Sequence, residues 1–328
     1  MVNWLVRWLP SKLLNMLEWK HITGKTGYMN MDQSLVVTYD LDDRRTVLID
    51  SGYRECPELI SWSRNRGREI AAVLCTHLHV DHMGNNGLIQ RKMKADIHVS
   101  RREYQVQQAR FRSDDAISFE WMGREKYFFG DSGMYETTII EPDQKSVRIG
   151  DAEFIIEDLS GHSPGHIGFV TPDGVLHIGD AFMSDIVLRH SKLPYEYDIT
   201  KTLETLKRIK KMDHPYYAAS HRAVIPAESI RETVDANIAY HEKMLDEILQ
   251  RLNGWQRMDR FILEVIANRG IEIRRSRSSV WLPVAVRSYI EHMIRDGRIE
   301  TRRESLMGEG RALPKDEVYI KRSYDKCE

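Results

Sequence analysis

The stretch most informative about the fold reads Thr76-His77-Leu78-His79-Val80-Asp81-His82-Met83-Gly84. It directly follows the apolar run Ala71-Ala72-Val73-Leu74-Cys75. A short run of that kind is typical of a buried strand, so we expect the polar cluster where a strand ends and a loop begins. Imidazole and carboxylate groups are ligands for zinc and other first-row metals. The stretch therefore predicts a metal site, which explains four clustered candidate ligands better than a polar loop with hydrogen-bonded histidines does.

The spacing inside this stretch bears on the number of ions. If the end of the strand stays extended, the side chains of His77 and His79 point the same way. Asp81 and His82 are adjacent, so their side chains cannot easily both point to the same side as those of His77 and His79. A second ion beside the first would accommodate them. Two-metal hydrolytic sites hold their ions roughly 3.5–4 Å apart. Two ions need more ligands than these four, and the rest of the chain should supply them.

Three later segments place similar residues directly after probable strands. Residues 153–157 precede His162 and His166, residues 174–178 lead into Asp180, and the apolar stretch 216–219 leads into His221. Taken alone, each of these polar residues would be interpreted as an ordinary loop residue. Their shared position after strands, where sheet proteins gather functional loops, groups them with the first stretch.

Together the motifs resemble those of the metallo-β-lactamase-fold hydrolases. Leu48-Ile49-Asp50-Ser51-Gly52 is similar to the strand and turn that support the metal loop in that family, and the five motifs follow the family's order over about residues 30–225. The resemblance implies an α/β fold, a four-layer αββα sandwich. It also implies two sets of ligands joined by a bridging aspartate: His77, His79 and His162 for one ion, Asp81, His82 and His221 for the other, and Asp180 for both.

The resemblance further implies a catalytic role for Asp81, which would orient a hydroxide and move its proton. Asp180 would set the distance between the ions. Asp50 and His166 are expected behind the ligands, where hydrogen bonds fix ligand orientation, although packing alone would explain either residue equally well. The other histidines, among them His98, His177, His190 and His214, match no motif and are interpreted as structural or surface residues.

The chemistry expected at such a site follows from the ions. A bound metal lowers the pKa of water from 15.7 to about 7, so hydroxide becomes available near neutral pH. Hydroxide held between two ions could attack an acyl carbon or a phosphorus atom. Zinc is the expected metal, and histidine and carboxylate ligands also suit iron or manganese.

Composition is consistent with an enzyme of this class. At 328 residues the chain exceeds an average domain, so we expect one large domain and a smaller one. The net charge of −1 gives no reason to expect bulk binding to nucleic acid or to an anionic membrane. Cys56, Cys75 and Cys327 are odd in number and scattered, which does not predict a disulfide framework and favours a cytoplasmic location.

Residues 1–20 have apolar side chains close to helical spacing, which predicts an N-terminal helix. Arg7, Pro10 and Lys12 interrupt the apolar pattern, so no integral membrane segment is expected. The segment also lacks the hydrophobic region and cleavage site of a signal peptide. A helix packed on the body or on a partner subunit is favoured over a helix lying in a membrane interface.

After the N-terminal segment, the sequence pattern predicts three further units: a metal-binding domain, a connecting helix and a C-terminal tail. We expect a metal-binding domain at 21–226 and a connecting helix at 227–254, where the apolar residues follow helical periodicity. Within residues 255–328, helices at 260–268 and 280–295 precede a hairpin around 307–310, an arrangement that resembles a winged helix. Such tails occur in one branch of the hydrolases named above.

The charge of this C-terminal tail argues against DNA as its partner. Residues 255–328 contain 16 Lys and Arg against 12 Asp and Glu, a net of +4, and Arg274-Arg275-Ser276-Arg277 is the one dense cluster. A nucleic-acid face carries a concentrated basic patch. The favoured role is structural, either covering the site or building a homo-oligomer, and nucleic acid stays the less favoured partner.

Aromatic residues are frequent between the first and second groups of ligands. Residues 101–108 are predicted to be helical, and aromatic side chains from Tyr104 to Tyr135 are interspersed with arginines. Two interpretations are equally well supported: these aromatics line a partly apolar substrate pocket, or they form a small core of this insertion.

Three functions are compatible with the motifs. The first is hydrolysis of a small-molecule thioester, ester or lactone. The alternative is a phosphodiesterase or endoribonuclease activity at the same two-metal site. A regulator without enzymatic activity is disfavoured by seven intact ligand candidates. The near-neutral charge of the chain favours the first function, because a nucleic-acid substrate binds best to a basic protein surface.

Overall fold

The computed structural model describes residues 17–31, 34–53, 55–112, 135–221, 223–271, 278–306 and 315–323 of the chain. Several features predicted above lie outside these ranges: most of the N-terminal helix, the aromatics between 113 and 134, the 274–277 cluster and the hairpin turn at 307–310. Among the described residues, no helix is both long and apolar enough to cross a membrane.

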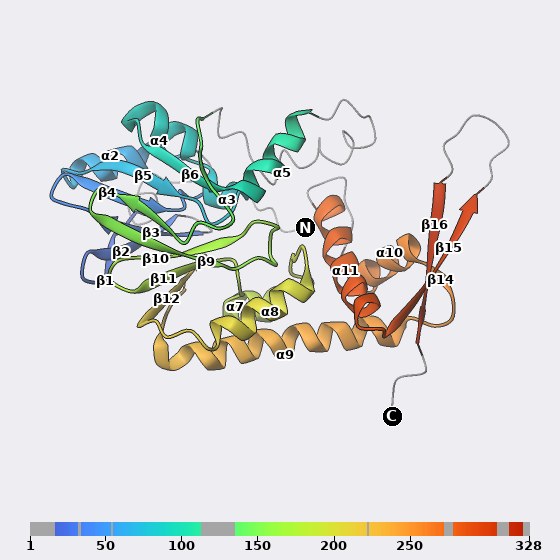
Figure 1. Cartoon of the computed structure of the whole chain (residues 1–328). Helices are drawn as coiled ribbons and strands as arrows, with labels where there is room; N and C mark the ends of the chain where they lie inside the picture. Colours follow the sequence, from blue (N-terminus) through green and yellow to red (C-terminus); the bar gives the residue numbers. More distant parts are fainter. Residues whose placement is uncertain are drawn as a thin grey trace, which may run out of the picture.

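The first sheet contains seven strands among the described residues, in the order β1-β2-β3-β4-β5-β6-β7 (Figure 1). The strands are β1 (Lys20–Thr23), β2 (Thr26–Met31), β3 (Ser34–Asp40), β4 (Arg45–Ile49), β5 (Glu69–Leu74), β6 (Asp96–Ser100) and β7 (Thr138–Ile140). Strands β1 to β4 pair antiparallel, whereas β4 to β7 pair parallel. The parallel pairs require crossover connections. These contain α2 (Pro57–Asn65) before β5, α3 (Val80–Met83) and α4 (Asn86–Met93) before β6, and α5 (Arg101–Arg112) after it.

The second sheet has six strands in the described part of the chain, in the order β13-β12-β11-β10-β9-β8. They are β8 (Ser146–Ile149), β9 (Ala152–Asp158), β10 (Ile167–Val170), β11 (Val175–Gly179), β12 (Tyr216–Ala219) and β13 (Ala223–Pro226). The pair β11 and β12 is parallel, and α7 (Asp185–His190) and α8 (Ile199–Ile209) form the connection between them. Both sheets are therefore mixed, and together they give the predicted α/β architecture.

One hydrophobic core lies between the two sheets. In β5, Ala72 and Leu74 face this core together with Phe154 and Phe169 of the second sheet. Val73, between them in the sequence, packs on the opposite face of the first sheet, with residues of α2 and α4. Because side chains alternate along a strand and both faces are covered, β5 appears in the sequence as an unbroken apolar run.

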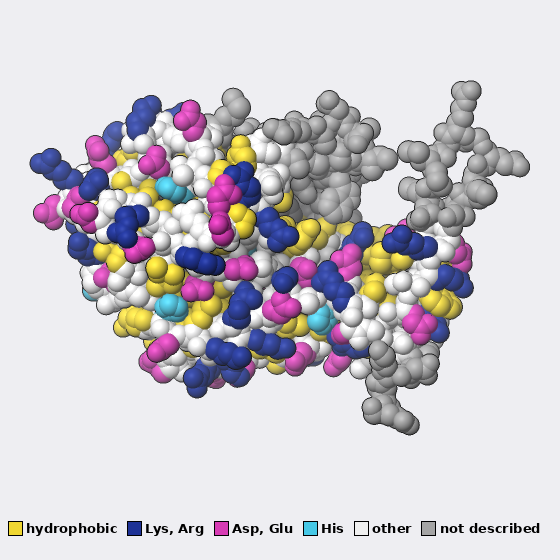
Figure 2. All heavy atoms as spheres, viewed as in Figure 1, with side chains coloured by type: hydrophobic (Ala, Val, Ile, Leu, Met, Phe, Trp, Pro, Cys, Tyr) yellow, Lys and Arg dark blue, Asp and Glu magenta, His cyan; other side chains and the backbone are white. Residues whose placement is uncertain are grey.

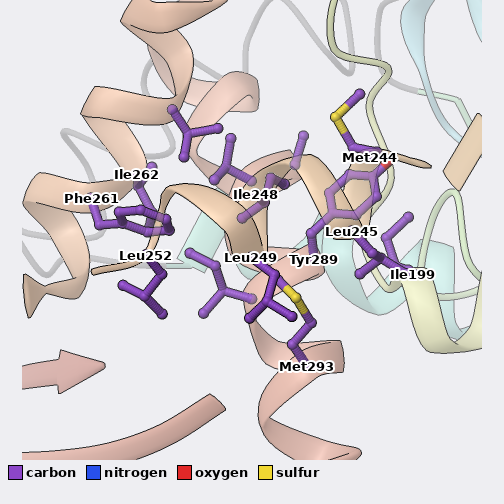
Figure 3. Packing of buried hydrophobic residues seen from close by; sticks show 14 of the residues in the cluster. Ile199, Met244, Leu245, Ile248, Leu249, Leu252, Phe261, Ile262, Tyr289 and Met293 are labelled. Carbon is purple, nitrogen blue, oxygen red and sulfur yellow. The ribbon is translucent and has the colours of Figure 1, made fainter. Parts of the chain in front are cut away.

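The chain continues through the long helix α9 (Ala227–Arg251) into a C-terminal region of helices and a small sheet. This region contains α10 (Met258–Asn268), α11 (Ser278–Arg295) and an antiparallel sheet in the order β14 (Gln256–Arg257), β16 (Lys315–Arg322), β15 (Ile299–Leu306). The helices predicted at 260–268 and 280–295 are confirmed, and β15 and β16 pair antiparallel as the predicted hairpin requires. Figure 3 shows that the region shares one hydrophobic cluster with α9 and with Ile199 at the start of α8.

Aromatic packing between the sheets gives a first testable prediction. The ring of Phe154 is fully buried and packs edge-on against Tyr39, with ring centroids 5.5 Å apart. Phe154→Ala would leave a cavity in this core, so the free energy of unfolding should fall by about 3–5 kcal/mol. The side chain of Ile155 on the same strand is 43% exposed, so Ile155→Ala should change the free energy of unfolding by no more than about 0.5 kcal/mol. Chemical denaturation of both variants measures the difference, and equal effects would contradict this core assignment.

Candidate metal centre

The predicted site residues all follow strands whose carboxyl ends meet at one edge of the two sheets. Asp50 follows β4, the stretch from Thr76 follows β5, Asp180 follows β11, and His221 follows β12 within two residues. His162 lies in the loop between β9 and β10. Ligands bind at the carboxyl ends of strands in open α/β sheets because the loops converge there. The topology therefore brings together residues that are up to 144 positions apart in the sequence, from His77 to His221.

Three imidazoles converge on the inner side of the cluster. His79 Nδ1 lies 2.9 Å from His77 Nε2 and 3.1 Å from His162 Nε2. The ligand atoms of these three residues lie within 4.8 Å of one another, close enough to hold one metal ion. The ring of Tyr195 packs edge-on against His79 and His162, with centroid distances of 5.5 Å to each. His77 and His79 thus face the same way, as the extended spacing predicts.

Asp180 lies at the centre of the cluster. Its Oδ2 atom is 3.2 Å from His221 Nε2, 3.4 Å from His82 Nε2 and 3.5 Å from His162 Nε2. Two more groups of candidate ligands share this aspartate: His77, His82 and Asp180, and Asp81, Asp180 and His221. The side chains of His221 and Asp81 are 32% and 21% exposed, whereas His82 is fully buried. The cluster is therefore accessible from the side of Asp81 and His221.

Residues 80–83 form the short helix α3. Successive residues of a helix point about 100° apart, because 3.6 residues complete a turn. His82 is consequently buried beside His77, and Asp81 faces the more open side near His221. The helix thus explains why two adjacent residues contribute to different ligand groups.

Hydrogen bonds at Nδ1 orient three of the histidine rings. His162 Nδ1 donates to the carbonyl oxygen of Tyr195 at 3.1 Å, and His82 Nδ1 donates to Asp50 at 2.8 Å. His77 Nδ1 lies 3.1 Å from the hydroxyl of Thr76, which donates its own proton to Asp50 and can accept the proton of His77. A neutral imidazole carries one N–H. In each neutral ring the Nε2 lone pair therefore faces the cluster.

Two buried polar atoms support a metal as the group that this cluster binds. His82 Nε2 and Asp180 Oδ1 are buried and make no hydrogen bond within the described residues. Burying an unpaired polar atom is costly, whereas coordination to a cation would satisfy both atoms. The donor set of imidazole nitrogens and carboxylate oxygens is the one that zinc, iron and manganese use. The residues present fit a divalent metal.

Asp50 lies behind the ligands and joins several elements. It is fully buried, has a left-handed backbone conformation (φ 63°), and accepts hydrogen bonds from Thr76, His82 and His177. Burial raises the pKa of Asp50, but the imidazoles of His82 and His177 outweigh burial and hold that pKa well below its usual value. Backbone strain of this kind occurs where the surroundings over-determine a functional residue.

His166 supports Asp180 from the other side. Its Nδ1 donates to the carbonyl oxygen of Leu159 at 3.0 Å, so its Nε2 accepts the backbone N–H of Asp180 at 3.3 Å. The preceding Gly179 has φ +55°, and a Cβ there would lie 2.3 Å from His166 Nε2. Only glycine permits this approach, which fixes the peptide that presents Asp180.

Three buried residues near the site were not singled out from the sequence. His177 lies inside the apolar strand β11 and contacts Asp50 at 3.1 Å. Glu103 accepts hydrogen bonds from Leu78, Ser163 and Gly165, so it joins the two ligand loops, and burial raises its pKa although these donors oppose the change.

The third, Glu196, lies 4.0 Å from His162 Nδ1. Burial raises the pKa of Glu196 to about 8. Neither His177, Glu103 nor Glu196 has the spacing of a metal ligand in the sequence. The residues Ser100-Arg101-Arg102-Glu103 match a helix capping pattern, which would direct the Glu103 carboxylate to the start of its own helix and away from the ligand loops.

The histidines of the cluster differ in protonation in the absence of a bound ion. Burial and the neighbouring imidazoles lower the pKa of His77 and His79 well below the usual value. Asp180 raises the pKa of His221 to about 9. Burial lowers the pKa of His82, but Asp180, Asp81 and Asp50 outweigh burial and raise it well above the usual value. His82 and His221 therefore carry protons at neutral pH that a metal would displace.

Comparison with known proteins agrees with this geometry. The family model described as Metallo-beta-lactamase superfamily matches residues 30–221, more than half of the chain. These residues include every candidate ligand named above. No curated protein matches the sequence.

Several solved structures are similar in fold. A beta-lactamase domain protein from Burkholderia ambifaria has a TM-score of 0.67 at 15% identity, covering 97% of this chain and 96% of that one. A metallo-beta-lactamase family protein from Thermus thermophilus has a TM-score of 0.62 at 14% identity, covering 94% and 97%. The metallo-beta-lactamase MIM-1 from Novosphingobium pentaromativorans has a TM-score of 0.54 at 20% identity, covering 70% and 90%. The first two similarities thus extend over nearly the whole chain, including the C-terminal region.

The protonation of His82 and His221 predicts how metal binding depends on pH. Because the protonated rings cannot coordinate, affinity for Co²⁺ or Zn²⁺ should rise as the pH increases from about 6 to 9, and binding at pH 7 should release on the order of one to two protons per chain. Isothermal titration calorimetry in buffers of different ionisation enthalpy measures this release. His221→Gln should reduce it, whereas His214→Gln, at the opposite end of β12, should not. Binding without proton release would contradict the assignment of His82 and His221.

Proposed function

The chain belongs to the metallo-beta-lactamase superfamily, and we propose that it is a hydrolase with a dinuclear metal centre that cleaves a small-molecule thioester, ester or lactone. The observation that carries this proposal is the buried cluster around Asp180. Seven candidate ligands converge there, two of their buried atoms lack hydrogen-bond partners among the described residues, and the side of Asp81 and His221 is open. That combination suits a centre that binds ions and admits a substrate.

The proposed assignment gives each ion its own ligands. His77, His79 and His162 hold one ion, and His82, Asp81 and His221 hold the other, with Asp180 shared between them. The distances of Asp180 Oδ2 to nitrogens of both sets, 3.2–3.5 Å, support the shared role. We propose zinc, because nitrogen and carboxylate ligands without cysteine are usual for catalytic zinc, and the same donors leave iron and manganese as alternatives.

When bound, the two ions would make hydroxide available near neutral pH and polarise the substrate oxygen. The protein's own groups then have distinct tasks in the proposal. Asp81, the more exposed carboxylate, orients the attacking group and takes up its proton. Asp50 and His166 keep His82 and Asp180 in place through the hydrogen bonds described above.

Charge distribution favours a small substrate over a nucleic acid. The chain has a net charge of −1, and Figure 2 shows basic and acidic side chains interspersed over the visible face. Nucleic-acid binding depends on a concentrated basic surface. A phosphodiester substrate stays the alternative, because the same two-metal chemistry acts on phosphorus.

We also propose a division of the chain at residues 226 and 254, with a winged-helix-like C-terminal unit. The order of α10, α11 and the β15–β16 hairpin supports this interpretation. Its shared core with α8 and α9 favours a structural role over an independent binding module.

The proposed reaction is tested with one metal-loaded preparation on two substrate classes. We expect a larger kcat/KM on a panel of acyl thioesters and lactones than on bis(p-nitrophenyl) phosphate. Asp180→Asn should lower the activity by at least about 100-fold, since it weakens the shared ligand. Asp151→Asn, an exposed carboxylate at the opposite end of β9 from the loop that carries His162, should leave activity unchanged. A larger kcat/KM on the phosphodiester would replace the proposed substrate class with the alternative.

A further inference from the structure

Residues 195–200 lie between the loop that carries His162 and the C-terminal region. On the loop side, His162 Nδ1 donates to the carbonyl oxygen of Tyr195 at 3.1 Å. The backbone N–H groups of Tyr197 and Asp198 both donate to the carbonyl oxygen of Gly161, at 3.1 and 2.9 Å. Three hydrogen bonds thus join this one segment to His162 and to the residue before it.

The contact between the two segments is also close. Gly161 has φ +145°, and a Cβ at this position would lie 2.6 Å from the backbone nitrogen of Thr202 and 2.7 Å from its Cα. Backbone atoms cannot move aside as the end of a flexible side chain can. The loop therefore rests directly on the first turn of α8, and a shift of that turn is transmitted to the loop.

The opposite side of residues 195–200 is held by α11. Ser288 Oγ accepts the backbone N–H of Ile199 at 2.7 Å, and Arg295 Nη1 donates to both carboxylate oxygens of Asp198, at 2.9 and 3.1 Å. Thr200 Oγ1 lies 2.9 Å from His292 Nδ1. Positions 288, 292 and 295 share one face of a helix, because they are spaced by four and three residues.

Packing anchors α11 at this place. Ile199 is fully buried in the cluster that Tyr289, Leu245 and other residues of α9 and α11 form (Figure 3). The hydroxyl of Tyr289 lies 2.8 Å from Nδ1 of the buried His241 on α9. Residues 195–200 are consequently held between the ligand loop on one side and the α9–α11 pair on the other.

We infer that Ser288, His292 and Arg295 are positioning residues for His162, acting through residues 195–200. This inference rests on the proposed metal centre. The bond from His162 Nδ1 to the Tyr195 carbonyl sets the rotation of the imidazole, so a displaced carbonyl turns Nε2 away from His79 and Asp180. The C-terminal region thereby supports the metal site although none of its described residues is among the candidate ligands.

Co²⁺ binding to the full chain, followed by its visible absorption spectrum, tests this inference without any substrate. Ser288→Ala should weaken the affinity about threefold to tenfold, less than the roughly 10–100-fold cost of removing a group that contacts a ligand directly. It should also alter the spectrum, because His162 is displaced. Arg287→Ala removes an exposed ion pair with Glu291 on the same helix and should change neither.

A double-mutant cycle with His162→Ala separates positioning from general stability. If Ser288 acts through His162, adding Ser288→Ala to His162→Ala weakens Co²⁺ binding no further. Equal weakening in both backgrounds, or no weakening in either, would overturn the inference. If circular dichroism shows that Ser288→Ala does not fold, Arg295→Ala takes its place, because that side chain is half exposed. A wild-type chain that binds no Co²⁺ would instead overturn the proposed metal centre.

Discussion

The buried carboxylate of Asp50 connects the parts on which the site depends. It follows β4 of the first sheet and accepts hydrogen bonds from Thr76 after β5, from His82 in α3 and from His177 in β11 of the second sheet. Burying a charged group costs free energy unless the group is fully paired and hydrogen-bonded. The energetic need to pair Asp50 therefore fixes the two sheets and the first ligand loop in one arrangement, and the positions of the ligands follow from it.

Support for the ligands extends outward from this centre in successive contacts. Glu103 joins the loops of Leu78 and Ser163, and His166 holds the peptide of Asp180. Residues 195–200 then hold His162, and α11 holds residues 195–200. Removing a group that holds a ligand in place typically weakens metal affinity roughly 10–100-fold. The inferred role of α11 makes the C-terminal region part of the support for the proposed metal site.

Much of this arrangement could be predicted because local patterns determine it. The apolar runs that precede His77, Asp180 and His221 proved to be strands, and the connecting helix predicted at 227–254 is α9 (Ala227–Arg251). The supporting residues escaped prediction because tertiary contacts alone determine their roles. His177 lies within an apolar strand, and Glu103 matches a capping pattern but turns its carboxylate toward the ligand loops. Residues 80–83 form a helix, which buries His82 against Asp50.

The most direct test of the central claim is anomalous diffraction at the zinc absorption edge from crystals of the zinc-loaded chain. We expect two anomalous peaks beside Asp180, one among His77, His79 and His162 and the other next to Asp81 and His221. A separation of roughly 3.5–4 Å between the peaks would agree with two-metal hydrolytic sites. A single peak, or peaks away from Asp180, would contradict the dinuclear centre and with it the proposed reaction.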